Sequence, residues 1–182
     1  MAHRETLKEL QSRLTQRFHL ARSSNIAMTW LAAVAGSKNY LIPLRHSGEI
    51  LPAPQLRPVP RTKDWFLGVV NVRGSLYGTV DLAQFVADFS FREGNAAIET
   101  AAYGPNAPTV ITFHPALEVN CALQVSALAG LRSADSFASS MPAPAGAPVY
   151  FGDQYLDAES IGWQVINIQE LSQTLEFLNI SA

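Results

Sequence analysis

The spacing of hydrophobic residues changes near residue 29, which predicts a helix followed by a mainly β domain. Between residues 4 and 22, large apolar side chains recur at spacings of three and four and so share one helix face: Leu7, Leu10, Leu14 and Phe18. The stretch holds no Gly or Pro, and most of its basic residues fall off that face. Such a helix can dock on its own domain, on a partner helix or on a membrane surface. We expect docking on its own domain, because the narrow apolar stripe has to be covered.

Beyond residue 29, short apolar runs separated by turn residues predict β-hairpins. The runs 29–35 and 38–44 flank a Gly-Ser turn, and the runs 65–71 and 75–81 flank a turn that ends in Gly74. The pattern therefore predicts two strand pairs in the first half of the chain.

Prolines limit where these strands can pair. Pro43 has no backbone donor, so its strand is expected to be an edge at that point or to leave the sheet. Four more prolines predict a stiff, extended crossing segment between the hairpins: Pro52, Pro54, Pro58 and Pro60.

A short helix and a second set of strands are predicted to complete the chain. The helix covers about 82–89, with Asp81 as its N-cap, and a connection without clear periodicity follows at 93–108. Further strands are predicted at 108–113, 120–125, 149–152 and 162–168, with a looser stretch at 133–148 and a final helical segment at 169–178.

The two halves of the chain repeat each other. Trp65 and Phe151 stand 86 positions apart, and so do Asp81 and Asn167, each of which lies between two apolar residues. Each half reads as two strands, a crossing, two more strands and a short helix. The repeat predicts two similar small β-barrels packed side by side, formed by halves at about 29–92 and 109–178.

Composition favours a packed fold with an uneven charge distribution. Hydrophobic residues make up 48% of the 182 residues and charged ones 15%, and the net charge of −2 disfavours a nucleic-acid-binding surface. Residues 1–28 carry five basic and two acidic side chains, whereas residues 109–182 carry one basic and seven acidic ones. The asymmetry is compatible with surfaces for different partners or with ordinary solvated faces.

The sequence favours a cytoplasmic location. No apolar run approaches the roughly 18 to 20 residues that span a bilayer, and the first residues lack the apolar core of a signal peptide. Cys121 is the only cysteine, so no disulfide framework is available.

No residue pattern indicates catalysis, a metal site or a cofactor. The chain has no glycine-rich phosphate loop, and its four histidines are scattered: His3, His19, His46 and His114. Cys121 lies in an apolar strand, where a buried thiol is usually inert, and Asp81 and Asp153 are explained by capping and turn roles. We therefore expect a protein that is not an enzyme.

The turn of the second predicted hairpin carries the most specific signal. Gly74 suits a turn with positive φ, and the Asn71 side chain can fix that turn by accepting a backbone hydrogen bond. Arg73 stands between them. A guanidinium at a hairpin tip can grip a partner's carboxylate, although an ordinary solvated arginine is an equal alternative from the residues alone.

Several short motifs follow in a fixed order around this turn. They are Glu49-Ile50, Pro58-Val59-Pro60, the run from Trp65 to Gly74 that contains Asn-x-Arg-Gly, and Val80-Asp81-Leu82. In this order they resemble the signature of the CheW-like adaptor family. The resemblance covers about residues 29–178, most strongly 38–86, and leaves residues 1–28 as an N-terminal helical extension. It implies two intertwined, five-stranded, SH3-like β-barrels.

The resemblance also implies a function. CheW-like proteins are non-catalytic scaffolds that couple the cytoplasmic signalling tip of a chemoreceptor to the regulatory domain of a CheA-type histidine kinase. The positions that carry over as partner-binding residues are Glu49, Ile50, Asn71, Arg73 and Gly74.

The sequence departs from the family at a few positions. Ser47 and Gly48 stand where an apolar residue usually comes two before the glutamate, and Pro43 lies in a strand that usually lacks proline. The N-terminal helix and the run Trp65–Gly68 look like the PilI branch, whose members act in the chemosensory system for type IV pilus twitching motility. The alternatives are an SH3-like module that binds a peptide or small ligand outside chemotaxis, and a fragment of a longer chain.

Overall fold

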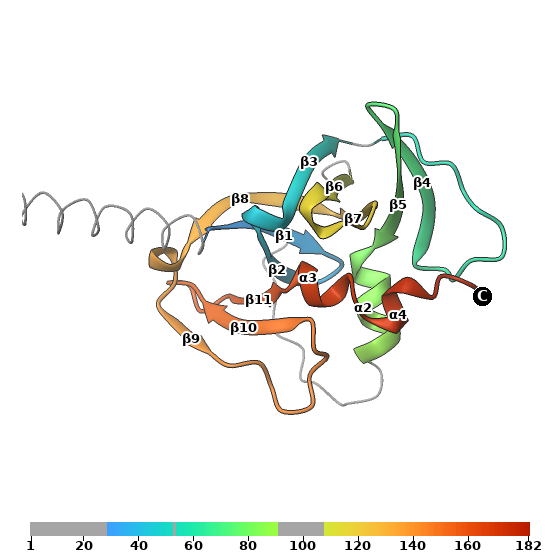
Figure 1. Ribbon diagram of the computed structural model, residues 1–182. Helices are drawn as coiled ribbons and strands as arrows, with labels where there is room; N and C mark the ends of the chain where they lie inside the picture. Colours follow the sequence, from blue (N-terminus) through green and yellow to red (C-terminus); the bar gives the residue numbers. More distant parts are fainter. Residues whose placement is uncertain (1–28, 53, 91–107) are drawn as a thin grey trace, which may run out of the picture.

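The chain forms a mainly β structure with two packed sheets and a few short helices (Figure 1). The computed structural model describes residues 29–52, 54–90 and 108–182; the predicted helix at 4–22 and most of the connection at 93–108 lie outside these ranges. The first-half elements are β1 Thr29–Ala35, β2 Lys38–Pro43, β3 Ser47–Pro52, β4 Phe66–Val72, β5 Ser75–Asp81 and α2 Leu82–Ser90. The second-half elements are β6 Thr109–Phe113, β7 Cys121–Val125, β8 Ala127–Ser133, β9 Ser139–Met141, β10 Phe151–Leu156, β11 Gly162–Ile166, α3 Ile168–Leu171 and α4 Leu175–Leu178.

Each sheet combines strands from both predicted halves of the chain. One sheet has the order β8-β1-β2-β11-β10-β9 and the other β3-β6-β7-β5-β4. The halves exchange their first hairpins, since β1 and β2 join the late strands and β6 and β7 join the early ones. Four pairings join the two halves: β2 with β11 and β5 with β7 are parallel, and β1 with β8 and β3 with β6 are antiparallel. The first sheet has six strands rather than five because the three-residue β9 adds to its edge.

Both hairpins and the helix cap of the first half are as predicted. Gly36, at φ 60°, turns β1 into β2, and the Asp81 side chain accepts a hydrogen bond of 3.0 Å from the backbone N–H of Gln84 at the start of α2. Pro43 is the last residue of β2, and the parallel pairing with β11 involves only Tyr40 and Leu41. Pro43 still pairs with Trp30 on β1 but has no partner on the β11 side, so the proline is tolerated because the strand is an edge at that point, one of the two expected outcomes.

The continuous apolar run of β1 is explained by burial on both faces. Leu31, Ala33 and Ala35 face the main core, which both sheets and α2 share. Trp30 and Ala32 face a smaller core that also contains Leu41, Tyr155 and Trp163. β1 thus separates the two hydrophobic cores.

The repeat at 86 positions holds in three dimensions at the helix caps, whereas the preceding strand is offset by one residue, so that Trp65 corresponds to Tyr150 rather than to Phe151. Asp81 and Asn167 both cap helices, and their backbone N–H groups donate 2.8 Å hydrogen bonds to the carbonyls of Trp65 and Tyr150 respectively. The residue that follows each cap is fully buried: Leu82 after Asp81 and Ile168 after Asn167.

The C-terminal region differs from the single helix predicted at 169–178. It forms two short helices, α3 and α4, because Ser172 and Thr174 donate side-chain hydrogen bonds to the carbonyls of Gln169 and Leu171 and end the first helix. α4 then places Phe177 against Phe85 and Phe113 in the main core. The strands β8 and β9 were not predicted either, because their small and polar residues show no clear alternation.

Candidate partner-binding site

The tip of the β4–β5 hairpin is a two-residue turn with positive φ at both positions. Arg73 has φ 50° and Gly74 has φ 91°, the combination that defines a type I′ turn and matches the twist of the flanking strands. The Asn71 side chain accepts a hydrogen bond of 2.9 Å from the N–H of Gly74, as the sequence predicted. Val70 and Val72 on β4 are buried, so the core fixes the hairpin that carries the turn.

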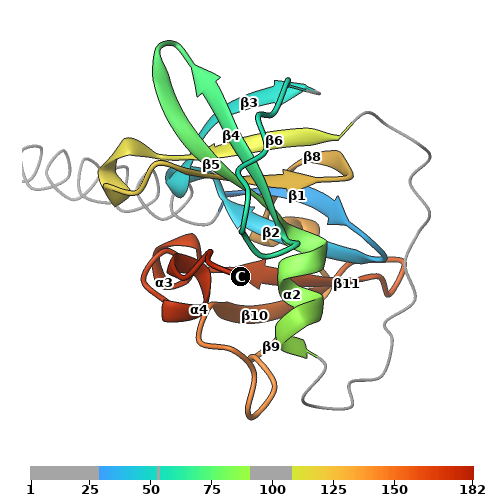
Figure 2. The same cartoon turned by 90° about the vertical axis from the view of Figure 1, so that its right-hand side faces the viewer.

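Arg73 makes an ion pair across the five-stranded sheet. Its Nε lies 3.0 Å from Oε1 of Glu49, with the two side chains 82% and 40% exposed. β3 and β4 are the two ends of the strand order, so the pair joins its opposite edges, and both views show the hairpin tip beside β3 (Figures 1 and 2). An exposed pair of this kind contributes only about 0 to 1 kcal/mol to stability. Its main effect is to hold both charged groups in one place.

An irregularity in β3 sets the position of Glu49. The register between β3 and β6 shifts between Ser47 and Ile50, and the N–H of Glu49 donates to Thr112 Oγ1 at 2.7 Å. A Cβ on Gly48 would lie 2.5 Å from that same Thr112 oxygen, so only glycine fits this position.

The departures at residues 47 and 48 therefore have a local cause. Ser47 is buried and donates to the carbonyl of Pro43 at 3.1 Å, which ties the start of β3 to the end of β2. Ser47 and Gly48 shape the backbone before Glu49.

Two exposed apolar residues accompany the ion pair. Ile50, one of the positions that the family resemblance implies, is 44% exposed, and Leu76, opposite Asn71 in the hairpin, is 58% exposed. Leu76 was missed, although its place two residues after the tip glycine could have marked it. A charged pair beside exposed apolar side chains is a surface suited to another protein.

The remaining candidate residues carry no chemistry of their own. Cys121 is partly buried in β7, and burial raises the pKa of its thiol to about 11, so it is hardly ionised at neutral pH. Asp153 is exposed on β10. Among the described residues, no group of three or more His, Cys, Asp or Glu side chains could hold a metal ion.

His46 and His114, which are far apart in the sequence, lie close together in the structure. The backbone N–H of His114 donates to the carbonyl of His46 at 2.8 Å. The Nδ1 atom of His46 is buried and has no hydrogen-bond partner among the described residues. Burial lowers the pKa of His46, and the nearby charges of Arg45 and His114 lower it further.

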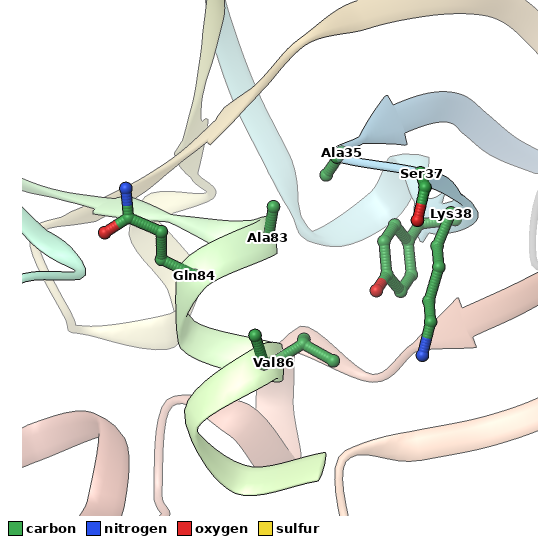
Figure 3. A pocket seen from close by; sticks show the side chains of 9 residues that line it. Ala35, Ser37, Lys38, Ala83, Gln84 and Val86 are labelled. Carbon is green, nitrogen blue, oxygen red and sulfur yellow. The ribbon is translucent and has the colours of Figure 1, made fainter. Parts of the chain in front are cut away.

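An open cleft of about 350 Å³ lies between the β1–β2 turn and α2 (Figure 3). Ala35, Tyr40, Ala83 and Val86 supply much of its wall, and Lys38 stands at its rim. None of the described residues that line it is a His, Cys, Asp or Glu, and its polar side chains are those of Ser37, Lys38, Tyr40 and Gln84.

Comparison with known proteins decides the family. The model of the CheW-like domain matches residues 29–146, which include the hairpin, the ion pair and the strands that exchange between sheets. The chain belongs to the CheW-like family. Scaffolds and adaptors of chemosensory systems make up this family, and at that level the function is assigned.

Individual CheW-like relatives agree with this assignment. Protein PilI of Pseudomonas aeruginosa PAO1 is 37% identical over 51 residues, a match that spans 28% of this chain and 29% of that protein. The crystal structure of the scaffolding protein TtCheW from Thermoanaerobacter tengcongensis superposes with a TM-score of 0.54 at 14% identity, covering 77% of this chain and 88% of that one. The second likeness confirms the fold of this CheW-like domain. Within its described residues, no helix is long and apolar enough to cross a membrane.

Proposed function

We propose that this CheW-like chain is a non-catalytic adaptor that couples a chemoreceptor signalling tip to the regulatory domain of a CheA-type histidine kinase. In this role the chain is cytoplasmic and is recruited to membrane-associated receptor arrays. The surface around Glu49, Ile50, Asn71, Arg73 and Gly74 binds one of these two partners. The family assignment and the local geometry of this surface support the proposal.

The conformation of Arg73 is the observation that carries the proposal. A non-glycine residue in the left-handed region costs about 1 to 2 kcal/mol, and Asn or Gly would fit the first position of this turn better. The side chain is 82% exposed, so its packing does not offset the cost. Arg61 shares this strain, but only Arg73 combines it with the tip of a core-fixed hairpin and an ion pair with Glu49, and this combination is explained if a partner needs the side chain.

Titration calorimetry with Arg73→Ala tests this proposal. The parent chain and the variant are titrated with a receptor signalling-tip fragment and, separately, with a kinase regulatory domain. Arg73→Ala is expected to weaken one affinity at least about tenfold, or about 1.4 kcal/mol, because a positioned guanidinium forms bidentate contacts that alanine lacks. Arg73→Lys is expected to recover little of this affinity.

Arg61→Ala is the matched control. Arg61 is also an exposed arginine at positive φ, 62°, but it lies in the proline-rich segment, where its carbonyl accepts from the N–H of Ala182. Its replacement removes the same charge and the same side chain away from the hairpin tip. Unchanged affinity of Arg73→Ala for both partners, or an equal loss with Arg61→Ala, would reject the site.

The output of the system is proposed to be type IV pilus motility. The support is the PilI match together with the predicted N-terminal helix and the run Trp65–Gly68. Deleting the gene in its native cell is expected to abolish twitching and to leave swimming intact. Loss of swimming with normal twitching would assign the adaptor to a flagellar system instead.

The cleft beside α2 favours one second candidate, a module that binds a small ligand. Its volume of about 350 Å³ falls within the range of ligand pockets, and its walls are largely apolar with one cation at the rim. Lys38→Glu together with Ala83→Phe would fill the cleft and reverse the rim charge. If this variant binds both partners with unchanged affinity, the adaptor function does not depend on the cleft.

A further inference from the structure

Two leucines are exposed where β1 begins. Leu131 on β8 is 61% exposed, and Leu44, which directly follows β2, is 39% exposed. β1 pairs with both strands at this end, Thr29 with Ser133 on β8 and Trp30 with Pro43 on β2. The two leucines therefore flank the start of β1 from opposite sides.

One of the exposed leucines, Leu131, extends the apolar surface of the main core. Residues directly opposite each other in an antiparallel pair share one face of a sheet. Leu131 is opposite Leu31, which is buried in the main core, so Leu131 continues the same face beyond the edge of that core. We call Leu44 and Leu131 the leucine pair.

The segment that precedes Thr29 carries a matching stripe. The four stripe residues of the predicted helix end at Phe18, eleven residues before Thr29. The predicted helix ends at residue 22, and the seven residues from there to Thr29 reach at most about 25 Å when extended, which lets the helix lie against the leucine pair. The segment is also basic, with five basic and two acidic residues in 1–28.

The second half of the chain, which supplies β8, is acidic. Residues 109–182 hold seven acidic side chains and a single basic one, Arg132, which lies on β8. The Arg132 guanidinium lies 5.5 Å from the centre of the Trp163 ring, and Arg132 alternates with Leu131 along the strand, so it belongs to the opposite face of the sheet. Asp135 is exposed just after the end of β8.

We infer that the amphipathic segment 4–22 docks on its own domain, with Leu14 and Phe18 covering the leucine pair. The connection through Thr29 holds the segment at high effective concentration near this surface, which favours it over a second copy of the chain. The inference concerns the architecture of the adaptor and does not depend on which receptor or kinase it binds.

Disulfide trapping in the full-length chain tests the inference. Phe18→Cys is paired with Leu131→Cys in a Cys121→Ser background and oxidised at low protein concentration. One control pairs Phe18→Cys with Leu175→Cys on α4, a site that is 79% exposed on an element that lies apart from β8 in both views (Figures 1 and 2). A second control pairs Gln16→Cys with Leu131→Cys, because residue 16 falls about 200° from residue 18 around a helix.

An intrachain disulfide between positions 18 and 131 that forms at least about tenfold faster than in either control supports docking. Equal rates in all three variants, or no intrachain disulfide, would overturn it in favour of a free segment. A disulfide between two chains would overturn it in favour of a second copy as the occupant. Hydrogen exchange of full-length Phe18→Ser gives a separate readout: faster exchange of the β8 amides is expected, and unchanged β8 exchange contradicts the inference.

Discussion

Arg57 and Val69 exchange two backbone hydrogen bonds of 2.8 Å each, which attach the proline-rich segment to β4. The two backbones come so close at this point that only glycine fits at position 68, next to Val69. A Cβ on Gly68 would overlap the carbonyl oxygen of Arg57, and Gly68 also has φ 123°. Gly68, within the motif run from Trp65 to Gly74, thus has a structural reason in this chain.

Gly68→Ala is expected to lower the free energy of unfolding by more than the roughly 1 to 3 kcal/mol of backbone strain alone. The excess comes from separating the two backbones to make room for the methyl group. Chemical denaturation of parent and variant measures the change in midpoint at an unchanged m value.

Gly74→Ala is the control for the glycine experiment. Gly74 also has positive φ, 91°, but no atom lies within 4 Å of its Cβ position, so the substitution adds strain without overlap. Equal losses for the two variants would show that the close approach to Arg57 does not matter.

Arg73→Asn is expected to keep the stability of the parent within about 1 kcal/mol while binding is lost. Asparagine relieves the left-handed strain, and the ion pair that disappears contributes little. Arg73→Val should instead lose about 1 to 3 kcal/mol, since a β-branched residue is strained at φ 50°. Thermal unfolding separates the two variants. If Arg73→Asn loses as much stability as Arg73→Val, the arginine serves the fold rather than a partner.

Phe177→Ala is expected to destabilise the protein by about 3 to 5 kcal/mol. Phe177 is 2% exposed, stacks on Phe113 at a centroid distance of 5.8 Å and meets Phe85 edge-on at 5.5 Å. Its removal therefore leaves a cavity between α4 and the core. Leu175→Ala on the same short helix is the control, with an expected change within about 0.5 kcal/mol because Leu175 is 79% exposed. A small effect of Phe177→Ala in urea unfolding would mean that α4 does not contribute to the core.

Stability is expected to fall below neutral pH in part because of His46. The pKa of His46 in the folded protein lies below its usual value of 6.5, so the unfolded chain binds more protons as the pH falls through that region. The contribution is fully present above about pH 6.5 and is lost as the pH falls toward the lower, folded-state pKa. Unfolding free energies measured between pH 5 and 7.5 are expected to show a smaller slope for His46→Gln.

His114→Gln gives an independent check on the cause of the histidine shift. Its charge is one of the influences that lower the pKa of His46, so its removal should move that pKa upward toward 6.5 in an NMR titration. An unchanged pKa of His46 in this variant would leave burial and Arg45 as the causes.

The sequence by itself determined the local features of this protein. The hairpin turns at Gly36 and Gly74, the bond from Asn71 to its own turn, and the caps at Asp81 and Asn167 each depend on residues within a few positions of one another. Such interactions follow from backbone geometry and side-chain reach alone. The family motif rests on the same local features, which is why the fold class could also be predicted.

Only the tertiary structure decided how the strands are shared and which distant residues meet. The parallel pairings of β2 with β11 and β5 with β7 join segments far apart in the sequence, and no periodicity specifies a long-range partner. Glu49 and Arg73 lie on opposite ends of a strand order, so their contact exists only once the sheet curls. The position of α4 has the same origin, because Phe177 on that helix packs against Phe85 and Phe113. Local sequence determines which helices and strands form, whereas burial of a shared core determines which of them pack and pair with one another.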